Sequence, residues 1–307
     1  MNFKTEYGEF ELSKTLRTQL KPDWKATRFP AKDRPINVQM YARIPFLISA
    51  EHRLAELDIS LCGKDILEFG CGYGELAHLM AKYEGTTVHA IDVDEYIADQ
   101  APDLNSWNPK DLEFVNNKWT EVRNTLASKL PKSVTDKVTF GTCGMEAYAT
   151  PNPHDIIISW DTLEHIVNLP MAFTQMANSV KKGGIVYSEY NPFFSLTGGH
   201  SLCTLDFLFG HCQLNNDDFE RYIREVRPEE EKQALNFYHK CLNRFTQAQI
   251  KNLALKNGFE ILKFEGGSTI DFKKVPEDIL KNVQKHYPSV TEVDLLHDSV
   301  HLILRRV

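Results

Sequence analysis

The stretch Asp65–Ala81, DILEFGCGYGELAHLMA, decides the fold. A short apolar run ends at Gly70, two further glycines follow at Gly72 and Gly74, and a helical pattern of apolar residues begins after them. A strand, a glycine turn and a helix in this order are typical of folds that bind a nucleotide. The stretch therefore predicts an α/β core and leaves the kind of nucleotide to be found.

The spacing of the glycines and the position of two acids narrow the kind of nucleotide. The dinucleotide fingerprint G-x-G-x-x-G needs its third glycine at the position of Glu75. Glu68, at the end of the apolar run, would repel a pyrophosphate above the turn and attract a cationic ligand. Asp92 ends the next apolar run and is well placed to accept both hydroxyls of a ribose, a role shared by dinucleotide and adenosyl sites. The sequence thus favours a ribose-containing ligand with a positive charge.

Apolar runs alternate with helical patterns through most of the chain. Strands are expected at DILEFG, TVHAID, VTFGTC, HDIIISW, IVYSEYN, EILKFEGG and SVHLILRRV, in chain order. Helices are expected between them, one of them around Trp119–Lys129, and apolar spacing over Ile36–Leu57 predicts another helix before the first strand, despite Pro45. This alternation predicts a Rossmann-like, doubly wound α/β fold, with a mostly parallel seven-stranded sheet covered by helices on both faces.

The alternation stops after Pro192, and this break sets the expected domain organisation. The segment 193–243 is rich in aromatic residues, contains three glycines and three histidines, and is long for a plain connection. We expect an N-terminal helical arm over 1–60, a cofactor-binding core over 61–192, an inserted helical lid over 193–243, and the end of the core sheet over 244–307.

Composition limits the function classes. The chain of 307 residues has a formal net charge of -7 and no long basic run, which counts against a nucleic-acid partner. Its six cysteines form no C-x-x-C pair, as expected in a reducing cytoplasm. The N-terminus is too polar for a secretory signal, and no apolar run approaches the roughly 20 residues of a membrane helix. We expect a cytoplasmic protein without a nucleic-acid or membrane partner, and a homodimer is compatible with the sequence.

Four segments in order carry a family resemblance: ILEFGCGYGELA, VHAIDVD, HDIIISWDTLEHI and VKKGGIVYSEYNP. Together they resemble the class I S-adenosylmethionine-dependent methyltransferases over roughly Lys64–Asn191 and the final two strands. The resemblance implies S-adenosylmethionine as cofactor, an antiparallel last strand in the sheet, and a small-molecule acceptor beneath the inserted lid. The sulfonium and ammonium groups of that cofactor would account for an acid at Glu68.

The resemblance also implies which residues contact the cofactor. The glycine turn would border its methionine part, Asp92 would bind the ribose hydroxyls, and Val93 would lie beside the adenine. The usual acid near the adenine corresponds to Gly144, so the backbone of Met145 and the carboxylate of Glu146 are the expected substitutes. The full set is Glu68, Gly70, Cys71, Gly72, Tyr73, Gly74, Asp92, Val93, Gly144, Met145 and Glu146, with Ser159 and Trp160 at the methionine end.

The segment DTLEHI follows the fourth expected strand and offers candidate ligands for a metal. Asp161, Glu164 and His165 are at i, i+3 and i+4, so a helical turn would place them on one face. The pattern is similar to the magnesium site of ubiquinone-pathway and small-RNA 3′-end methyltransferases, in which a downstream histidine or a water completes the shell. The alternative is a helix start that is common in this superfamily without metal. We favour this alternative, so no metal is expected.

Three histidines are the candidate catalytic residues. The segment GGHSLCTLDFLFGHC lies just past the fifth strand and resembles the G-H-x-L…H segment of bacterial methyltransferases linked to surface sugars and other small hydroxylated metabolites. His200 and His211 in this segment, and His165 beside the fourth strand, are candidate general bases because histidine titrates near neutral pH. The alternative is that the lid histidines form hydrogen bonds inside the lid. A zinc site that adds Cys203 and Cys212 is not expected, because two of its ligands would be adjacent.

Aromatic and charged residues of the lid also have two interpretations. Phe193, Phe194 and Phe209 either wall the acceptor pocket or form the core of the lid. The charged segment NNDDFERYIREVRPEEEK predicts a solvated helix, whose arginines could instead bind a carboxylate or phosphate of the acceptor.

These observations predict an enzyme that moves a methyl group from S-adenosylmethionine to a small polar metabolite. A hydroxyl of a sugar or a related compound is the expected acceptor. The alternatives are S- or N-methylation of an amino-acid-like metabolite and a non-catalytic cofactor-binding subunit. An RNA methyltransferase is disfavoured by the acidic balance of the chain.

Overall fold

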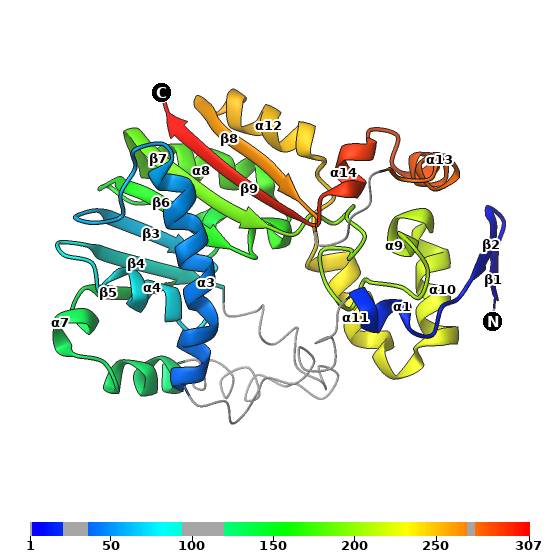
Figure 1. The fold of residues 1–307 in the computed structure, drawn as a ribbon, viewed down its shortest axis with the longest axis horizontal. Helices are drawn as coiled ribbons and strands as arrows, with labels where there is room; N and C mark the ends of the chain where they lie inside the picture. The colour runs from blue at the N-terminus through cyan, green and yellow to red at the C-terminus, as the bar shows by residue number, and fades with distance from the viewer. Residues whose placement is uncertain (1, 21–35, 94–119, 269–273) are drawn as a thin grey trace.

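A seven-stranded sheet forms the centre of the protein (Figure 1). The computed structural model describes residues 2–20, 36–93, 120–268 and 274–307. The strand order is β5-β4-β3-β6-β7-β9-β8, and all neighbours are parallel except the two pairs that involve β9. The predicted fold class, a mostly parallel sheet with an antiparallel last strand, is confirmed. The strands are β3 (Asp65–Phe69), β4 (Thr87–Asp92), β5 (Val138–Thr142), β6 (His154–Trp160), β7 (Val180–Tyr190), β8 (Phe259–Gly267) and β9 (Ser299–Arg306).

One face of the sheet is covered by α3 (Ile36–Ala55) and α4 (Glu75–Met80). Figure 1 shows α3 crossing this face. Leu54 of α3 and Ile158 of β6 belong to the same buried apolar cluster. Strands that are covered on both faces carry apolar side chains on both sides, and this cluster is on the α3 side. The predicted helix around Trp119–Lys129 is present at 120–128. Trp119, the first residue of the predicted range, lies outside the described residues. The short helix α7 (Lys132–Thr135) follows it and leads into β5.

The opposite face of the sheet is covered by α8 (Leu169–Ser179) and α12 (Gln247–Lys256). Phe173 of α8 and Ile250 of α12 share one apolar cluster with Leu67 of β3. The carboxyl ends of the parallel strands therefore open between two helical layers, where doubly wound folds bind their ligands.

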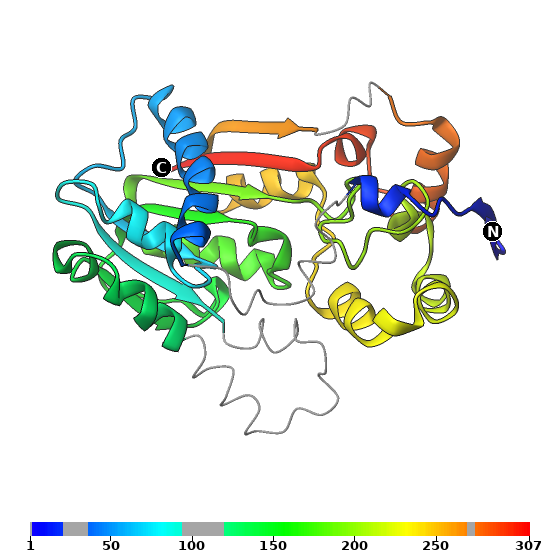
Figure 2. The same ribbon diagram turned by 60° about the horizontal axis from the view of Figure 1, so that its bottom comes forward.

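A second lobe lies beside the sheet in both views (Figures 1 and 2). Its buried apolar cluster draws on three parts of the chain that are far apart in the sequence. We call residues 2–20, 193–243 and 274–296 the second lobe, and the rest of the described chain the sheet lobe. The elements of the second lobe are β1 (Asn2–Thr5), β2 (Gly8–Glu11), α1 (Leu16–Leu20), α9 (Gly210–Gln213), α10 (Asn216–Val226), η4 (Pro228–Glu230), α11 (Glu231–Lys240), α13 (Glu277–His286) and α14 (Glu292–Leu296).

Packing in the second lobe joins segments that the sequence analysis had kept apart. The arm begins with the β1–β2 hairpin, which no sequence pattern indicated, and Phe3 packs edge-on against Tyr222 with ring centroids 5.2 Å apart. Between β8 and β9, α13 contributes Ile279 and Val283 to the same cluster as the predicted lid. Apolar contacts therefore connect the expected arm, the lid and the sheet end, while the four-part domain division stays a prediction.

The helix α3 has the length of a membrane span, with 20 residues, but carries charged side chains at Arg43, Glu51 and Arg53. No helix in the described part of the chain is both long and apolar enough to cross a membrane.

Candidate active site

The glycine turn after β3 has a backbone that favours glycine at three positions. Gly70, Gly72 and Gly74 have φ values of 71°, 55° and 85°, in the left-handed region where side chains cause strain. A Cβ added to Gly70 would lie 2.0 Å from Oγ1 of Thr162, so a larger residue would displace the segment that follows β6. The Gly70 amide donates to the Ile91 carbonyl at 2.9 Å. The turn is thereby held between the carboxyl ends of β3, β4 and β6.

The carboxylate of Asp92 lies against this turn at the end of β4. It accepts hydrogen bonds from the amide of Gly72 at 2.7 Å and from the amide of Val93 at 2.8 Å. An ionised carboxylate has about four acceptor sites and accepts bonds from hydroxyl groups as well as from amides. The position and the chemistry of this carboxylate fit the binding of ribose hydroxyls. The side chain of Val93 is exposed next to it, as a surface for an adenine requires.

Glu68 is a buried acid that has the chemistry to receive a cation. Its side chain is on the α3 face, the residue is 2% exposed, and Oε2 has no hydrogen-bond partner. Burial raises the pKa of Glu68 well above its ordinary value, and the neighbouring Glu75 adds to the effect. A buried carboxyl group without a donor is costly. The ammonium and sulfonium groups of S-adenosylmethionine would relieve this cost, so the residues present fit the cofactor.

Arg123, in the helix at 120–128, binds the carbonyl of Gly72, whose amide is bound by Asp92. Its Nε and Nη2 donate to the carbonyl of Gly72 at 3.1 and 2.7 Å, and Nη2 lies 3.5 Å from Sγ of Cys71. The guanidinium also lies over the ring of Phe140, 4.7 Å from its centroid. Tyr73, the next residue of the turn, is partly buried. Sequence reasoning missed Arg123, because an arginine in a helical pattern carries no positional signal.

The expected adenine contact follows β5. Gly144 has an extended backbone, and the single turn η2 (Met145–Ala147) begins directly after it with a buried Met145. A Cβ added to Gly144 would lie 2.7 Å from Oε2 of Glu146. The carboxylate of Glu146 thus folds back over Gly144, where the family's usual acid would begin. This geometry supports the prediction that Glu146 takes over the contact with the adenine amine.

Ser159 and Trp160 end β6, and their side chains point to opposite faces of the sheet. The hydroxyl of Ser159 is buried against the hydroxyl of Ser188 at 2.8 Å, so only its backbone can border the cofactor. Trp160 is on the face that carries Glu68 and lies 5.9 Å from the ring of Tyr187. Its indole Nε1 is buried without a hydrogen-bond partner. Trp160 therefore presents a free donor at the methionine end of the expected site.

The acids after β6 converge on Asn191 at the end of β7. Asn191 Nδ2 donates to Oδ1 of Asp161 at 2.8 Å and to Oε1 of Glu164 at 3.3 Å. Burial and the nearby Asp161 raise the pKa of Glu164 to about 8. The segment Leu163–His165 is a single 3-10 turn, and Asp161 has a left-handed backbone with φ 49°. The shared α-helical face assumed for a metal site is thus absent, because the turn has a different period.

Groups of side chains that could bind a metal are missing from the described ranges more widely. Within the ranges that the structure describes, no three His, Cys, Asp or Glu side chains are grouped so that they could hold a metal ion. Cys203 and Cys212, the thiols of the zinc site considered above, are both free and buried.

His165 has the hydrogen-bond pattern of a general base. Its Nδ1 lies 2.7 Å from the carbonyl of Cys241, so Nδ1 carries the proton and Nε2 carries the lone pair of the neutral ring. Burial lowers the pKa of His165 below its ordinary value. The neutral form with a basic Nε2 is therefore favoured at neutral pH. The ring packs edge-on against Phe237 with centroids 5.5 Å apart, so α11 fixes its orientation.

His200 lies next to His165 and has the opposite tautomer. The amide of Leu202 donates to Nδ1 of His200 at 3.2 Å, so the neutral ring carries its proton on Nε2. The His200 ring stacks on Phe237 at 3.9 Å and lies 6.4 Å from the His165 ring. This pair of histidines combines a proton acceptor and a hydrogen-bond donor.

His211 and the three candidate wall aromatics are in the interior of the second lobe. His211 is fully buried, its Nε2 lies 2.7 Å from the carbonyl of Phe193, and burial lowers its pKa to about 4. Phe193, Phe194 and Phe209 belong to the buried cluster, where Phe194 packs edge-on against Tyr287 at 5.1 Å. These contacts match the interpretation of the aromatics as the core of the lid. They also support a packing role for His211.

Glu189 is an acid at the end of β7 that the sequence analysis did not select. Burial and the nearby Asp161 raise the pKa of Glu189 to about 7. Its Oε2 lies 3.4 Å from the hydroxyl of Tyr187 and 3.5 Å from Nδ1 of His301. A usable signal was present, because the rule that selected Glu68 and Asp92, an acid at the end of a predicted parallel strand, also selects this residue.

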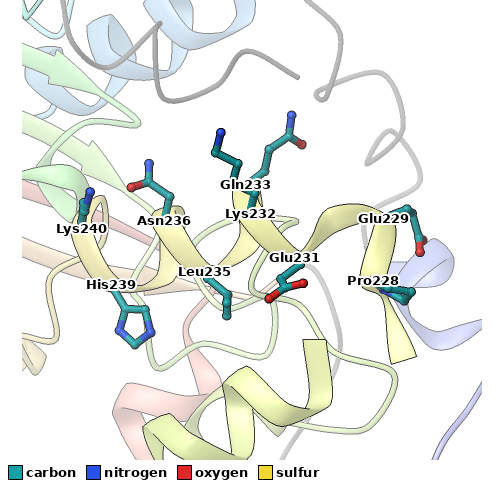
Figure 3. A pocket seen from close by; sticks show the side chains of 9 residues that line it. All are labelled: Pro228, Glu229, Glu231, Lys232, Gln233, Leu235, Asn236, His239 and Lys240. Atoms are coloured by element: carbon teal, nitrogen blue, oxygen red, sulfur yellow. The ribbon is translucent and has the colours of Figure 1, made fainter. Parts of the chain in front are cut away.

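A cavity of about 670 Å³ lies along α11. Figure 3 shows Lys232, Gln233 and Asn236 on one side of the helix and Leu235 and His239 on another. The side chains that line the cavity come from Pro228–Lys240 and include none of the predicted cofactor contacts. The predicted cofactor contacts thus lie at the carboxyl ends of the strands and not in this cavity.

Comparisons with known proteins show which family the chain resembles. The model of a family described as a methyltransferase domain matches residues 41–263, well over half of the chain. Magnesium protoporphyrin IX methyltransferase from Synechocystis is 14% identical, with 95% of this chain and 97% of that chain covered and a TM-score of 0.49. An S-adenosylmethionine-dependent methyltransferase from Mesorhizobium loti is 13% identical, with 83% and 96% covered and a TM-score of 0.47. Phosphoethanolamine N-methyltransferase 2 from Haemonchus contortus is 17% identical, with 82% and 51% covered and a TM-score of 0.46. A comparison with curated protein sequences gave no match.

The family match spans the glycine turn, both acids and the segment that follows β6. The strand order of the sheet and its antiparallel β9 agree with the fold expected from the resemblance to class I methyltransferases. The cofactor of this family is S-adenosylmethionine, and Glu68 and Asp92 are suited to its charged and ribose groups. The chain belongs to the methyltransferase domain family and is a class I S-adenosylmethionine-dependent methyltransferase.

Proposed function

We propose that the protein methylates a hydroxyl group of a small polar metabolite, such as a sugar, with His165 as the general base. The single observation that carries this proposal is the bond from His165 Nδ1 to the Cys241 carbonyl, which leaves the basic lone pair on Nε2. A hydroxyl acceptor has a high pKa and needs a base during the transfer, whereas a thiolate does not.

The roles of the other residues follow from their positions. Bound S-adenosylmethionine supplies an electrophilic methyl group. Glu68 would bind its cationic end and Asp92 its ribose hydroxyls, which fixes the direction of the methyl group relative to β6. His200 would donate a hydrogen bond from Nε2 to the acceptor oxygen, and His165 would take the hydroxyl proton on Nε2 during an in-line attack.

The test is a screen followed by one substitution. Purified protein is incubated with S-adenosylmethionine and a panel of sugars, polyols, amines and thiols, and S-adenosylhomocysteine is measured. For the hydroxyl that reacts, His165→Gln should lower kcat by roughly 10²–10⁴-fold and leave cofactor affinity unchanged. His239→Gln is the matched control, because His239 is on the exposed side of α11 and pairs with Glu220.

The pH profile gives the same test a second readout. His165 must be neutral to accept a proton, and its pKa is lowered below the ordinary value of 6.5. We expect kcat to stay level through neutral pH and to fall only on the acid side of 6.5, and this limb should disappear in His165→Gln. A wild-type kcat that His165→Gln leaves unchanged would overturn the assignment of the base.

N-methylation of an amine is a second candidate, and one observation favours it. Asp161, Glu164 and Glu189 bring three acidic side chains to the carboxyl edge of β6 and β7. Such an edge would attract an ammonium group. Turnover of amines alone in the panel would replace the hydroxyl proposal with this one. Cofactor binding without S-adenosylhomocysteine from any compound or extract fraction would instead indicate a non-catalytic subunit.

We further propose that the acceptor is a free metabolite in a reducing, cytoplasmic setting. None of the six cysteines, all of which lie in the described ranges, forms a disulfide, which supports such a setting. A nucleic-acid acceptor remains disfavoured by the net charge of -7. A homodimer stays a prediction that sedimentation equilibrium would test.

A further inference from the structure

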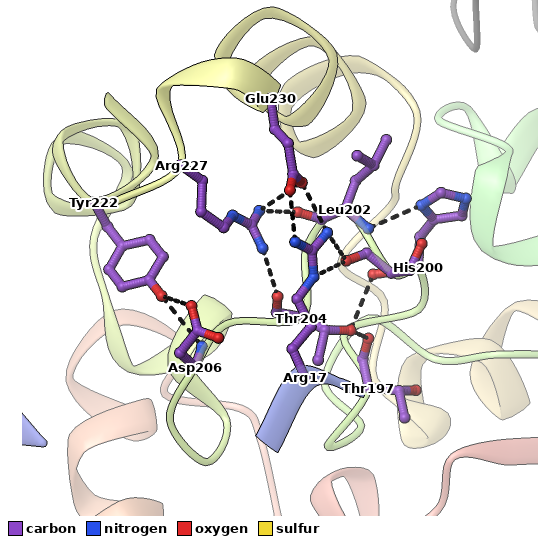
Figure 4. Close-up of polar contacts among 10 residues, drawn as sticks. Arg17, Thr197, His200, Leu202, Thr204, Asp206, Tyr222, Arg227 and Glu230 are labelled. Carbon is purple, nitrogen blue, oxygen red and sulfur yellow. Dashed lines mark hydrogen bonds and ion pairs between the residues drawn. The ribbon is translucent and has the colours of Figure 1, made fainter. Parts of the chain in front are cut away.

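Two buried arginines bind the backbone of the loop that carries His200 (Figure 4). We call residues 200–204 the His200 loop. Arg17, from the N-terminal helix α1, donates from Nε and Nη2 to the carbonyl of Ser201 at 3.1 and 2.8 Å. Arg227, after α10, donates to the carbonyls of Leu202 at 2.6 Å and Thr204 at 2.8 Å. Three carbonyls of the loop backbone thus accept hydrogen bonds from guanidinium groups that come from other parts of the chain.

One glutamate pairs with both arginines inside the second lobe and offsets part of their charge. Glu230, from η4, pairs with Arg17 through two bonds of 2.7 and 2.8 Å and lies 3.7 Å from Nη2 of Arg227. Both arginines are 4% exposed, and burial lowers their pKa values to about 10 for Arg17 and about 9 for Arg227. The segment around Arg227 was expected to be a solvated helix; Arg224 and Glu225 are exposed as expected, but Arg227 and Glu230 are buried.

The energetics of such a cluster favour a geometric role. Burying an ion pair costs desolvation that roughly cancels its attraction, so it is weak evidence for stability. The arginine fork, however, sets both distance and direction of the groups it binds. We therefore expect the main effect of the cluster to be on the conformation of the His200 loop. Its effect on the stability of the second lobe should be small.

The His200 loop transmits this geometry to the proposed acceptor site. The amide of Leu202, whose carbonyl Arg227 holds, donates to Nδ1 of His200 and so fixes the ring and its tautomer. The amides of Cys203 and Thr204 donate to the His200 carbonyl at 2.9 and 3.2 Å. The oriented ring then stacks on Phe237, which also contacts His165.

We propose that Arg17 is a positioning residue of the methyltransferase: the N-terminal arm sets the His200 loop, and with it the donor that faces the acceptor. The arm is then part of the acceptor half of the active site, although it is 184 residues away from Ser201 in the sequence. Only the kinetic readout below rests on the proposed function, since the structural readout needs no acceptor.

Hydrogen–deuterium exchange of the full chain tests the structural part. Arg17→Met should speed exchange of the Leu202, Cys203 and Thr204 amides by about 10- to 100-fold, the factor expected for loss of charged hydrogen bonds. Arg17→Lys should give a smaller increase, because lysine keeps the charge and lacks the fork. Exchange in β3 and β4 should not change.

The matched control removes another arginine that binds the arm. Arg221 donates to the carbonyl of Lys4 at 2.6 Å and lies over the ring of Phe3, but it makes no contact with the His200 loop among those described. Arg221→Met should therefore leave exchange in the loop unchanged. If Arg17→Met unfolds the lobe, Arg17→Lys and Glu230→Gln provide the comparison. Unchanged loop exchange in folded Arg17 and Glu230 variants would overturn the proposal.

The kinetic part uses the acceptor identified in the screen. Arg17→Lys should lower kcat/KM for that acceptor by about tenfold or more, since small displacements of a positioned group are costly. The Kd for S-adenosylmethionine, measured by calorimetry, should stay within about twofold, because Arg17 is remote from the glycine turn. Faster loop exchange with unchanged kcat/KM would overturn the positioning role. A screen in which no compound is methylated would count against the proposed function. The exchange result would still show whether Arg17 fixes the His200 loop.

Discussion

The sheet lobe and the second lobe fix their functional groups over very different distances along the chain. In the sheet lobe, Glu68, the glycine turn and Asp92 follow consecutive strands, and a bond from Gly72 to Asp92 spans 20 residues. In the second lobe, Arg17 reaches Glu230 across 213 residues. The cofactor half of the enzyme is therefore specified by local chain geometry. The proposed acceptor half is specified by contacts between distant segments.

The largest expected effect separates the two cores. Phe173→Ala in the sheet lobe and Phe219→Ala in the second lobe each remove a fully buried ring and should lower the free energy of unfolding by about 3–5 kcal/mol. Urea unfolding with and without S-adenosylmethionine measures both variants, and Leu255→Ala, at an exposed position, is the control. We expect the increase in unfolding free energy that S-adenosylmethionine causes to become smaller in Phe173→Ala only. Equal weakening by both substitutions would show that the lobes are not separable in this way.

A smaller effect should sharpen the local character of the cofactor half. Gly63 and Gly70 both have a left-handed backbone, but a Cβ meets nothing within 4 Å at Gly63 and lies 2.0 Å from Thr162 Oγ1 at Gly70. Gly63→Ala should cost about 1–2 kcal/mol of unfolding free energy from backbone strain alone. Gly70→Ala should cost more and weaken cofactor binding by more than about tenfold. Equal effects of the two substitutions on cofactor binding would contradict the role assigned to the turn.

The smallest effect concerns the charge of Glu68. Its pKa is raised in the folded protein, so the folded state binds the proton more tightly and stability without cofactor should decrease as pH rises above the ordinary value of 4.5. Glu68→Gln should flatten this dependence, and the variant should be slightly more stable than the wild type at pH 7 and equal to it at pH 4. Cofactor affinity should fall by about tenfold. A Glu68→Gln protein that binds S-adenosylmethionine normally would remove Glu68 from the cofactor site.

The cofactor half could be predicted from the sequence because its signals are periodic and contiguous. Strand ends, the glycine spacing and the acids at Glu68 and Asp92 all depend on residues within one β-turn-α-β unit. Arg123 escaped prediction, because its bond to Gly72 is made by a helix 51 residues further on. Glu189 escaped only because the strand-end rule was not applied to β7.

The acceptor half was predicted less well, for a reason visible in its histidines. His165, His200 and His211 were all candidate bases in the sequence, since each is a histidine near the carboxyl edge of the expected sheet. In the folded protein, a carbonyl fixes the proton of His165 on Nδ1 and an amide fixes that of His200 on Nε2. His211 is enclosed in the second lobe. Tautomer and burial depend on partners that no local pattern specifies.

The sequence by itself determined the sheet, the family resemblance and the methyl donor, because alternating apolar runs and a glycine turn specify backbone geometry over short distances. Only the tertiary structure decided that the hairpin β1–β2, the lid and α13 share one core, that Arg17 and Arg227 are buried with Glu230, and which histidine has a basic Nε2. These features arise from burial and charge pairing between distant segments. Their free energies depend on which groups meet in the fold.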